Sequence, residues 1–401
     1  SNRASVFCFL IAYCAEGLYN LFRWMGFIIP FITVMFNETL NATQIAIILI
    51  ASALTRIATE IPSGAIADKY SRRYVLISAC MLIAIGLLVW IFFPNFLGYL
   101  VGYILFGLSD SLVSGCEEAL LYDELGKFKK RNLFERVHGR AGAFSSVGIF
   151  IASVGSFFFI KIGFGYNFLI LTSIAVVIIA SFILLTIKPV KRIKESEEPE
   201  SVLSYMETLK EGLKYSFNHK LVLKMILFLS FVTYINIGAL EYIGIFYQEI
   251  TNDLSMVAVL SAIGSLAFAA GRFSGEYLKK LPIKILFSFF LVGSSLDLVT
   301  FSLYSYPLSI ITLTISTVLI CGVCVNTSAR MNDLIPGKIR ATIISVRGFI
   351  ESIGVMICLF AFGQVVDYFD SYQSGFLTFV CLSIIGSVVF LISFVRDKNL
   401  K

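Results

Sequence analysis

One short stretch of the chain gathers side chains that could do chemistry. Residues 110–124 read DSLVSGCEEALLYDE, although the preceding GYLVGYILFGLS has no charged residue. A buried carboxylate needs a cation or a hydrogen-bond donor, because an uncompensated charge in an apolar setting is costly. In a low-dielectric cleft it can also take up and release a proton. The carboxylates of this stretch are Asp110, Glu117, Glu118, Asp123 and Glu124.

The composition of the whole chain explains why this stretch is unusual. Its 401 residues are 58% hydrophobic and 14% charged, with a mean hydropathy of +0.87. Soluble domains carry about 25% charged residues. Apolar runs of about 20 residues, the length that crosses a bilayer, recur along the chain, and the period-2 alternation of a membrane barrel is missing. We therefore expect an all-α polytopic protein embedded in a lipid bilayer.

The apolar runs predict twelve transmembrane helices. The loops on one side of the membrane are rich in Lys and Arg. In the loops on the other side, Lys161 is the only Lys or Arg residue. The positive-inside rule then places both termini and the 188–220 linker in the cytoplasm. We expect the protein in the cytoplasmic (inner) membrane. This asymmetry accounts for the net charge of +6 without a nucleic-acid partner. The predicted spans are 4–36, 43–67, 74–94, 97–122, 136–160, 165–187, 221–249, 255–278, 283–304, 307–331, 340–366 and 372–395.

The two halves of the chain repeat each other. A shift of 207 residues lays GAIADKYSRR (64–73) over GRFSGEYLKK (271–280), and a related register pairs Arg23 with Glu241 and Gly26 with Gly244. Secondary transporters are commonly built from such repeats. We expect a six-helix bundle over 1–187, a cytoplasmic linker with a short amphipathic helix over 188–220, and a second bundle over 221–401.

The segment GAIADKYSRR resembles the loop signature of the major facilitator superfamily, with Ser71 in place of a Gly. The resemblance implies two six-helix bundles that rock around a central cavity. Spans 1, 4, 7 and 10 would line this cavity, 2, 5, 8 and 11 would form the bundle interface, and 3, 6, 9 and 12 would face lipid. Spans 3, 6 and 12 have no charged residue, and Asp297 is the only charge in the interior of span 9. This distribution agrees with the cost of exposing a charge to lipid.

The glutamates of span 4 are candidates for proton coupling. Helix rise places Glu117 and Glu118 at about the depth of Arg140 on span 5. An ion pair between them could simply neutralise buried charge and join the two helices. Alternatively, one glutamate carries the coupling proton.

A polar and aromatic patch is predicted on the cavity-lining spans. Arg23 and Glu241 stand at matching positions of spans 1 and 7, so a solute with both charge signs could bridge them. Equally, the two could bind each other and close the outer gate. The predicted cavity residues are Glu16, Asn20, Arg23, Trp24, Asp110, Asn236, Glu241 and Tyr242.

Further charged residues are candidates for a gate or conformational switch. Arg56 and Glu60 are four residues apart, as are Arg347 and Glu351, so each pair can close on one helix face. The pairs could neutralise themselves or exchange partners as the halves move. The resemblance implies that Asp68 holds the cytoplasmic closure. The complete set is Arg56, Glu60, Gly64, Asp68, Lys69, Arg72, Arg73, Asp123, Arg330, Arg347 and Glu351.

These features predict a transporter and not an enzyme. No metal cluster, Ser-His pair or phosphate loop is found at membrane depth, and the Cys321–Cys324 CxxC has no companion pair, so no metal or cofactor is expected. We expect a monomer that moves a small polar organic solute by alternating access, with H+ as coupling ion. Typical drug antiport is disfavoured, because Tyr103 stands where such members of the superfamily carry an Arg. Export of drug-like or metallophore-type compounds, ion-independent facilitation and a transport-dead receptor remain alternatives.

Overall fold

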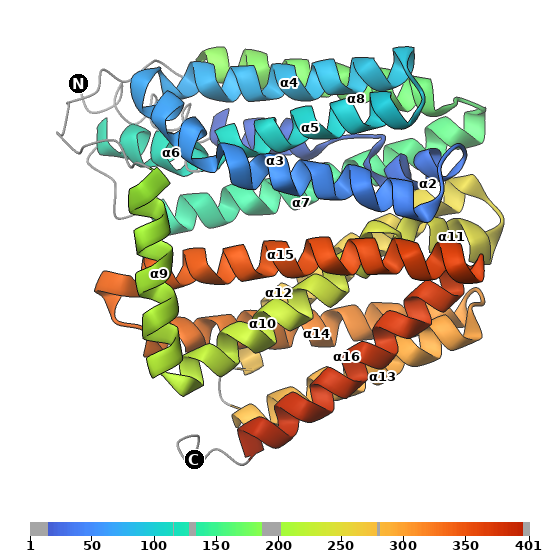
Figure 1. Ribbon diagram of the computed structural model, residues 1–401. Helices are drawn as coiled ribbons and strands as arrows, with labels where there is room; N and C mark the ends of the chain where they lie inside the picture. Colours follow the sequence, from blue (N-terminus) through green and yellow to red (C-terminus); the bar gives the residue numbers. More distant parts are fainter. Residues whose placement is uncertain (1–14, 115, 128–133, 187–201, 279–280, 396–401) are drawn as a thin grey trace. The chain divides into compact units, whose positions relative to one another are not determined.

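The computed structural model describes residues 15–114, 116–127, 134–186, 202–278 and 281–395 (Figure 1). Within these ranges the chain is made of helices and turns, without a strand. It separates into two compact units, one of residues 1–39 and 48–202 and one of residues 40–47 and 203–401. The predicted all-α membrane fold is confirmed, since eleven described helices are long and apolar enough to cross a membrane.

The first unit is organised around α4, which packs against both α5 and α8 (Figure 1). Trp90 of α4 is fully buried and stacks on Tyr103 of α5, with ring centroids 5.5 Å apart. Gly102 permits this packing, because a Cβ there would lie 2.0 Å from the Trp90 indole nitrogen. The helices are residues 15–24, η1 (Ile29–Phe31), α2 (Ile32–Asn37), α3 (Ala42–Lys69), α4 (Arg72–Phe92), α5 (Phe96–Val113), α6 (Cys116–Lys127), α7 (Phe134–Ile162) and α8 (Tyr166–Thr186).

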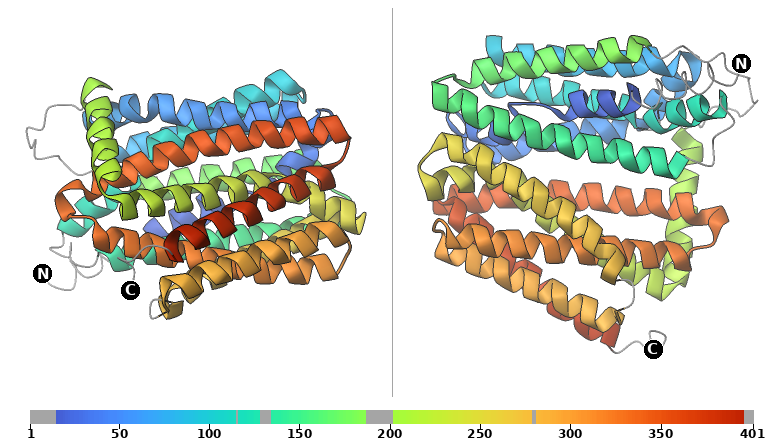
Figure 2. Two further views of the ribbon diagram at one scale, coloured as in Figure 1. Left: turned by 60° about the horizontal axis from the view of Figure 1, so that its bottom comes forward. Right: turned by 180° about the vertical axis from the view of Figure 1, so that it is seen from behind.

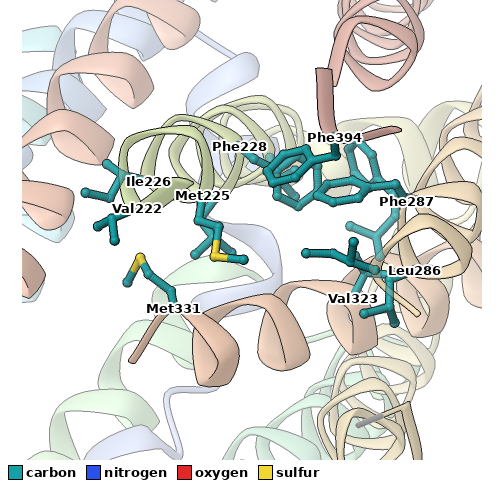
Figure 3. Packing of buried hydrophobic residues seen from close by; sticks show 14 of the residues in the cluster. Val222, Met225, Ile226, Phe228, Leu286, Phe287, Val323, Met331 and Phe394 are labelled. Atoms are coloured by element: carbon teal, nitrogen blue, oxygen red, sulfur yellow. The ribbon is translucent and has the colours of Figure 1, made fainter. Parts of the chain in front are cut away.

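The second unit is built around α14, which packs against α12 and α13, while α13 contacts α16 and α10 contacts α15. Figure 3 shows part of its core, where the rings of Phe228, Phe287 and Phe394 meet. The Phe287 centroid lies 4.4 Å from each of the other two. The helices are α9 (Val202–Asn218), α10 (Lys220–Glu241), α11 (Ile243–Thr251), α12 (Leu254–Tyr277), α13 (Ile283–Leu303), α14 (Leu308–Leu334), α15 (Gly337–Phe369) and α16 (Tyr372–Val395).

The amphipathic helix predicted in the linker is α9. It crosses the ends of α10 and α15 at a steep angle in both Figure 1 and Figure 2. Gly212 allows close packing on α15, because an added Cβ would lie 2.6 Å from a Val346 methyl group. The helix is therefore fixed on the second unit.

Three predicted spans are broken, which the prediction of continuous helices missed. In span 1 the helix over 15–24 stops before Met25 and Gly26, and Pro30 lies at the start of η1. Proline cannot donate the backbone hydrogen bond of a continuing helix. Span 7 is interrupted at Tyr242, between α10 and α11. Span 4 leaves helical geometry at Ser114, whose ψ is 123°.

The breaks in spans 1 and 7 come at matching positions of the repeat. One follows Arg23 and Trp24, and the other directly follows Glu241. Interrupted helices in transporters expose helix ends that can bind polar groups of a solute. The two halves thus share the position at which their first helix is interrupted, in addition to their sequence similarity.

Candidate functional site

A buried ion pair forms the centre of the charged cluster in the first unit. Arg23 Nη2 lies 3.1 Å from Asp110 Oδ1, joining the helix over 15–24 to α5. The Arg23 side chain is 6% exposed and that of Asp110 is 50% exposed. The guanidinium also lies 5.3 Å from the Trp24 ring. Asp110 thus compensates a cation that water reaches poorly, which makes the pair costly to break.

Glu16 and Asn20 lie on the same helix face as Arg23, at helical spacings of four and three residues. Both are buried. The Asn20 amide donates to the Glu16 backbone carbonyl at 3.2 Å and accepts from the Ser145 hydroxyl of α7, also at 3.2 Å. Asn20 therefore connects this helix to α7.

Glu117 and Glu118 occupy different environments in the first turn of α6. Glu117 is half-buried and interacts electrostatically with Arg23 and Tyr19, whereas Glu118 is exposed. Both gain from the positive end of the helix dipole. Glu117 is therefore the glutamate that faces the Arg23–Asp110 pair.

The two arginines that end the loop signature bind backbone carbonyls. Arg72 Nη1 donates to the carbonyl of Ala119 on α6 at 2.9 Å. Arg73 Nη1 lies 3.4 Å from the carbonyl of Leu185 on α8, and its Nη2 lies 2.9 Å from the Tyr74 hydroxyl. They connect the beginning of α4 to two other helices of the unit.

The Arg56–Glu60 pair does not close. Both side chains are exposed, and no ion pair joins these two described residues. Several other predicted site residues have side chains outside the described part of the structure. These are Gly64, Asp68, Lys69, Asp123, Arg140 and Asn236.

The corresponding pair in the second unit does close. Arg347 Nε lies 2.5 Å from Glu351 Oε1, and Arg347 Nη1 donates to the Ser328 hydroxyl of α14 at 2.9 Å. Arg347 and Glu351 thus form the ion pair that their four-residue spacing allows. Arg330 binds Asn326 Oδ1 at 2.8 Å and the Leu281 carbonyl at 2.5 Å, so it satisfies a backbone group beyond the end of α12.

Glu241 and Tyr242 lie at the interruption between α10 and α11 but differ in exposure. Glu241 is exposed. Tyr242 is fully buried, and its ring stacks on Phe362 with centroids 4.5 Å apart. Its hydroxyl donates to the Ala42 carbonyl at 3.0 Å. Tyr242 is therefore part of the interior of the second unit.

The same unit holds the beginning of α3. Asp367 on α15 accepts hydrogen bonds from the backbone amides of Ala42 and Thr43, at 3.0 and 3.1 Å. Gln364 donates to the Thr43 hydroxyl at 3.0 Å. A carboxylate at this position accepts hydrogen bonds from amides of the first turn that have no partner within the helix. Its negative charge is also stabilised by the positive end of the helix dipole. We call the Asp367 contacts the α3 cap.

A cavity of about 610 Å³ lies inside the second unit and follows α14. Its wall is largely aliphatic and aromatic, with a few polar groups. Two buried oxygen atoms on this wall, Asp297 Oδ1 and Asn332 Oδ1, have no hydrogen-bond partner among the described residues. The polar and sulfur-containing residues of the wall are Arg272, Asp297, Ser316, Thr317, Cys321, Cys324, Ser328, Asn332, Arg347 and Ser383.

Comparison with known proteins assigns the family. Residues 6–331 match the description of the Major Facilitator Superfamily. The chain belongs to the major facilitator superfamily. This membership agrees with the class of membrane transporter that the sequence predicted. Within the described residues, no three His, Cys, Asp or Glu side chains come together as a metal site.

Individual similar proteins support the fold. A curated relative from Bacillus subtilis (strain 168), the uncharacterized MFS-type transporter YxaM, is 24% identical over 270 residues. The match covers 65% of this chain and 62% of that protein, which is less than two thirds of its length. The nucleoside transporter NupG matches with a TM-score of 0.72 at 13% identity, covering 97% of this chain and 100% of its own. A D-xylose–proton symporter matches with a TM-score of 0.68 at 11% identity, covering 97% of each chain. At these identities the structures establish the shared fold alone.

Asp297 and Arg272 are charged residues of the cavity wall that were not among the predicted solute-site residues. The resemblance to the superfamily implied that span 9, now α13, faces lipid. The structure places Asp297 on the cavity wall, close to Ser316 of α14. The sequence did contain an indication of this position for Asp297, which is the only charged residue in the interior of span 9. A single charge in an apolar helix must face protein or water and not lipid.

Proposed function

We propose that the protein carries a small organic solute with polar groups across the cytoplasmic membrane by alternating access, as a monomer coupled to protons. The observation that supports this best is the cavity of about 610 Å³ along α14. Ligand sites of proteins commonly have volumes of about 300–1,000 Å³, apolar walls and a few polar groups. The interrupted helices that carry Arg23 and Glu241 add polar helix ends to each half.

Glu117 is the best candidate for the proton carrier. It is half-buried at the beginning of α6, close enough to Arg23 to interact electrostatically. Arg23 is already bound to Asp110. A proton on Glu117 would therefore change the net charge of the cluster without leaving the arginine unpaired. Such a change of charge can favour one of two arrangements of the helices in the first unit.

Proton coupling can be tested in proteoliposomes that contain the purified protein and a pH-sensitive dye. Amino acids, sugars, nucleosides and carboxylates are added in turn under a clamped membrane potential. We expect one class to acidify the lumen, and Glu117→Gln to abolish this proton flux while counterflow of the solute persists. Glu118→Gln is the matched control and should retain the flux. Counterflow that is independent of pH in all variants would indicate a facilitator, and binding without counterflow would indicate a receptor.

Export of amphipathic compounds is a second candidate function. It is favoured by the aromatic and aliphatic part of the cavity wall, which includes Phe268, Phe301 and Phe379. Inside-out vesicles distinguish the two directions. Energised accumulation of an amphipathic dye in such vesicles supports export, whereas its absence together with proton-driven uptake in right-side-out vesicles contradicts it.

A further inference from the structure

Residues of α13 line one part of the cavity of the second unit. There Asp297 lies beside Ser316, and Phe301 and Phe379 also line the wall. Asp297 Oδ1 is buried without a hydrogen-bond partner among the described residues. A buried carboxylate oxygen that lacks a donor is costly, so this site favours a ligand that supplies one.

A cation lies farther along the same cavity. Arg272 of α12 lies over the Phe268 ring, 5.2 Å from its centroid. It forms no ion pair with any residue that the structure describes. It interacts electrostatically with Cys321, and the neighbouring Gly271 packs against the same cysteine. Arg272 is therefore level with Cys321 on α14.

The remaining charge on the wall is already compensated. Arg347 is bound to Glu351 at 2.5 Å and to Ser328 at 2.9 Å. Among the described lining residues, one anion and one cation thus face the cavity without an ionic partner: Asp297 and Arg272. Two opposite charges held apart in one cavity can attract a ligand that carries both signs.

The offset of these two side chains along the axis of α14 can be estimated from the α14 residues beside them. Asp297 lies at the level of Ser316 and Arg272 at the level of Cys321. Five residues of an α-helix rise about 7.5 Å. Between these two levels, Thr317 and Ile320 of α14 line the wall.

We propose that this cavity binds a zwitterionic solute whose ammonium group contacts Asp297 and whose anionic group contacts Arg272, with an apolar spacer between the charges. The inference rests on the proposed transport function but names the class of solute for one half of the protein. It makes Asp297, on a helix that the superfamily resemblance assigned to lipid, a specificity-determining residue.

Three matched probes test the proposal: 6-aminohexanoate, hexylamine and hexanoate, which share a six-carbon chain. Binding to the purified full-length protein is measured by calorimetry and by protection of Cys324 from N-ethylmaleimide, located by mass spectrometry. We expect 6-aminohexanoate to bind roughly tenfold tighter than either single-charge probe, a difference of about 1.4 kcal/mol.

Two variants test which charge of the ligand each side chain binds. In Asp297→Asn the zwitterion should bind no better than hexanoate, and in Arg272→Gln no better than hexylamine. Asp333→Asn, an exposed acid on α14 away from the cavity lining, is the control. If either cavity variant fails to give a monodisperse protein, the other still tests its own charge. Equal binding of the three probes, no binding of any, or a preference unchanged in both variants would overturn the proposal.

Failure of this proposal can be told apart from failure of the transport function. Zwitterion binding without counterflow of any solute retains the site and contradicts transport. Counterflow of a sugar or nucleoside without zwitterion binding retains transport and contradicts the site.

Discussion

The two halves of this transporter use buried charge differently. In the first, Arg23 is bound to Asp110 and the signature arginines bind backbone carbonyls. In the second, Arg347 and Glu351 neutralise each other, but Asp297 and Arg272 have no ionic partner among the described residues. Paired charge joins helices, whereas unpaired charge on a cavity wall can bind a ligand. Removing the charge of Asp110 should therefore destabilise the protein more than removing that of Asp297.

The largest effect on stability is expected for Asp110→Asn. This variant removes the carboxylate that forms the ion pair with the buried Arg23 and leaves only the more distant Glu117, and losing one partner of a buried pair costs about 3–5 kcal/mol. Because half of the Asp110 side chain is exposed, we expect the lower end of this range, about 3 kcal/mol. Denaturation in detergent micelles measures it. The double variant Arg23→Met, Asp110→Leu should recover part of the loss, and failure to do so would mean that the pair is not the cause.

A smaller effect is expected when the α3 cap is weakened. Asp367→Asn retains one acceptor oxygen but loses the charge, so the second unit should lose about 1 kcal/mol of stability. Faster hydrogen exchange of the Ala42 and Thr43 amides would report the change locally. Asp370→Asn is the control, because Asp370 ends α15 but does not contact α3. Equal exchange in both variants would contradict the cap.

The smallest effect on stability is expected for Asp297→Asn. Its buried Oδ1 has no partner to lose among the described residues, so the free energy of unfolding should stay within about 1 kcal/mol of the wild-type value. Binding of 6-aminohexanoate should nevertheless fall. A loss as large as that of Asp110→Asn would show that Asp297 has a structural partner, and the contrast between the halves would then be wrong.

Features set by local spacing could be predicted from the sequence. Apolar runs predicted the helical membrane fold. The four-residue spacing allowed both Arg347–Glu351 and Arg56–Glu60 to pair, but only the first pair forms among the described residues. The Arg23–Asp110 pair joins residues 87 positions apart, so helix packing decides it and no local pattern reveals it. The interruption after Trp24 was missed because a long apolar run hides the effect of Pro30. Whether Asp297 faces the cavity depends on which side α13 turns toward α14. The sequence shows only that a lone charge is present in this helix, not the direction in which it points.

The α3 cap also has a consequence for timing. The first turns of α3, within residues 40–47, belong to the second unit, and the rest of the helix from Ile48 belongs to the first. Any motion that moves one unit against the other must bend α3 near that point or release the amides of Ala42 and Thr43 from Asp367. If they are released, each opening leaves these two amides exchangeable with solvent for as long as it lasts. The rate at which these two amides exchange with deuterium would then report how often the protein opens. The measurement needs neither a solute nor a chemical label.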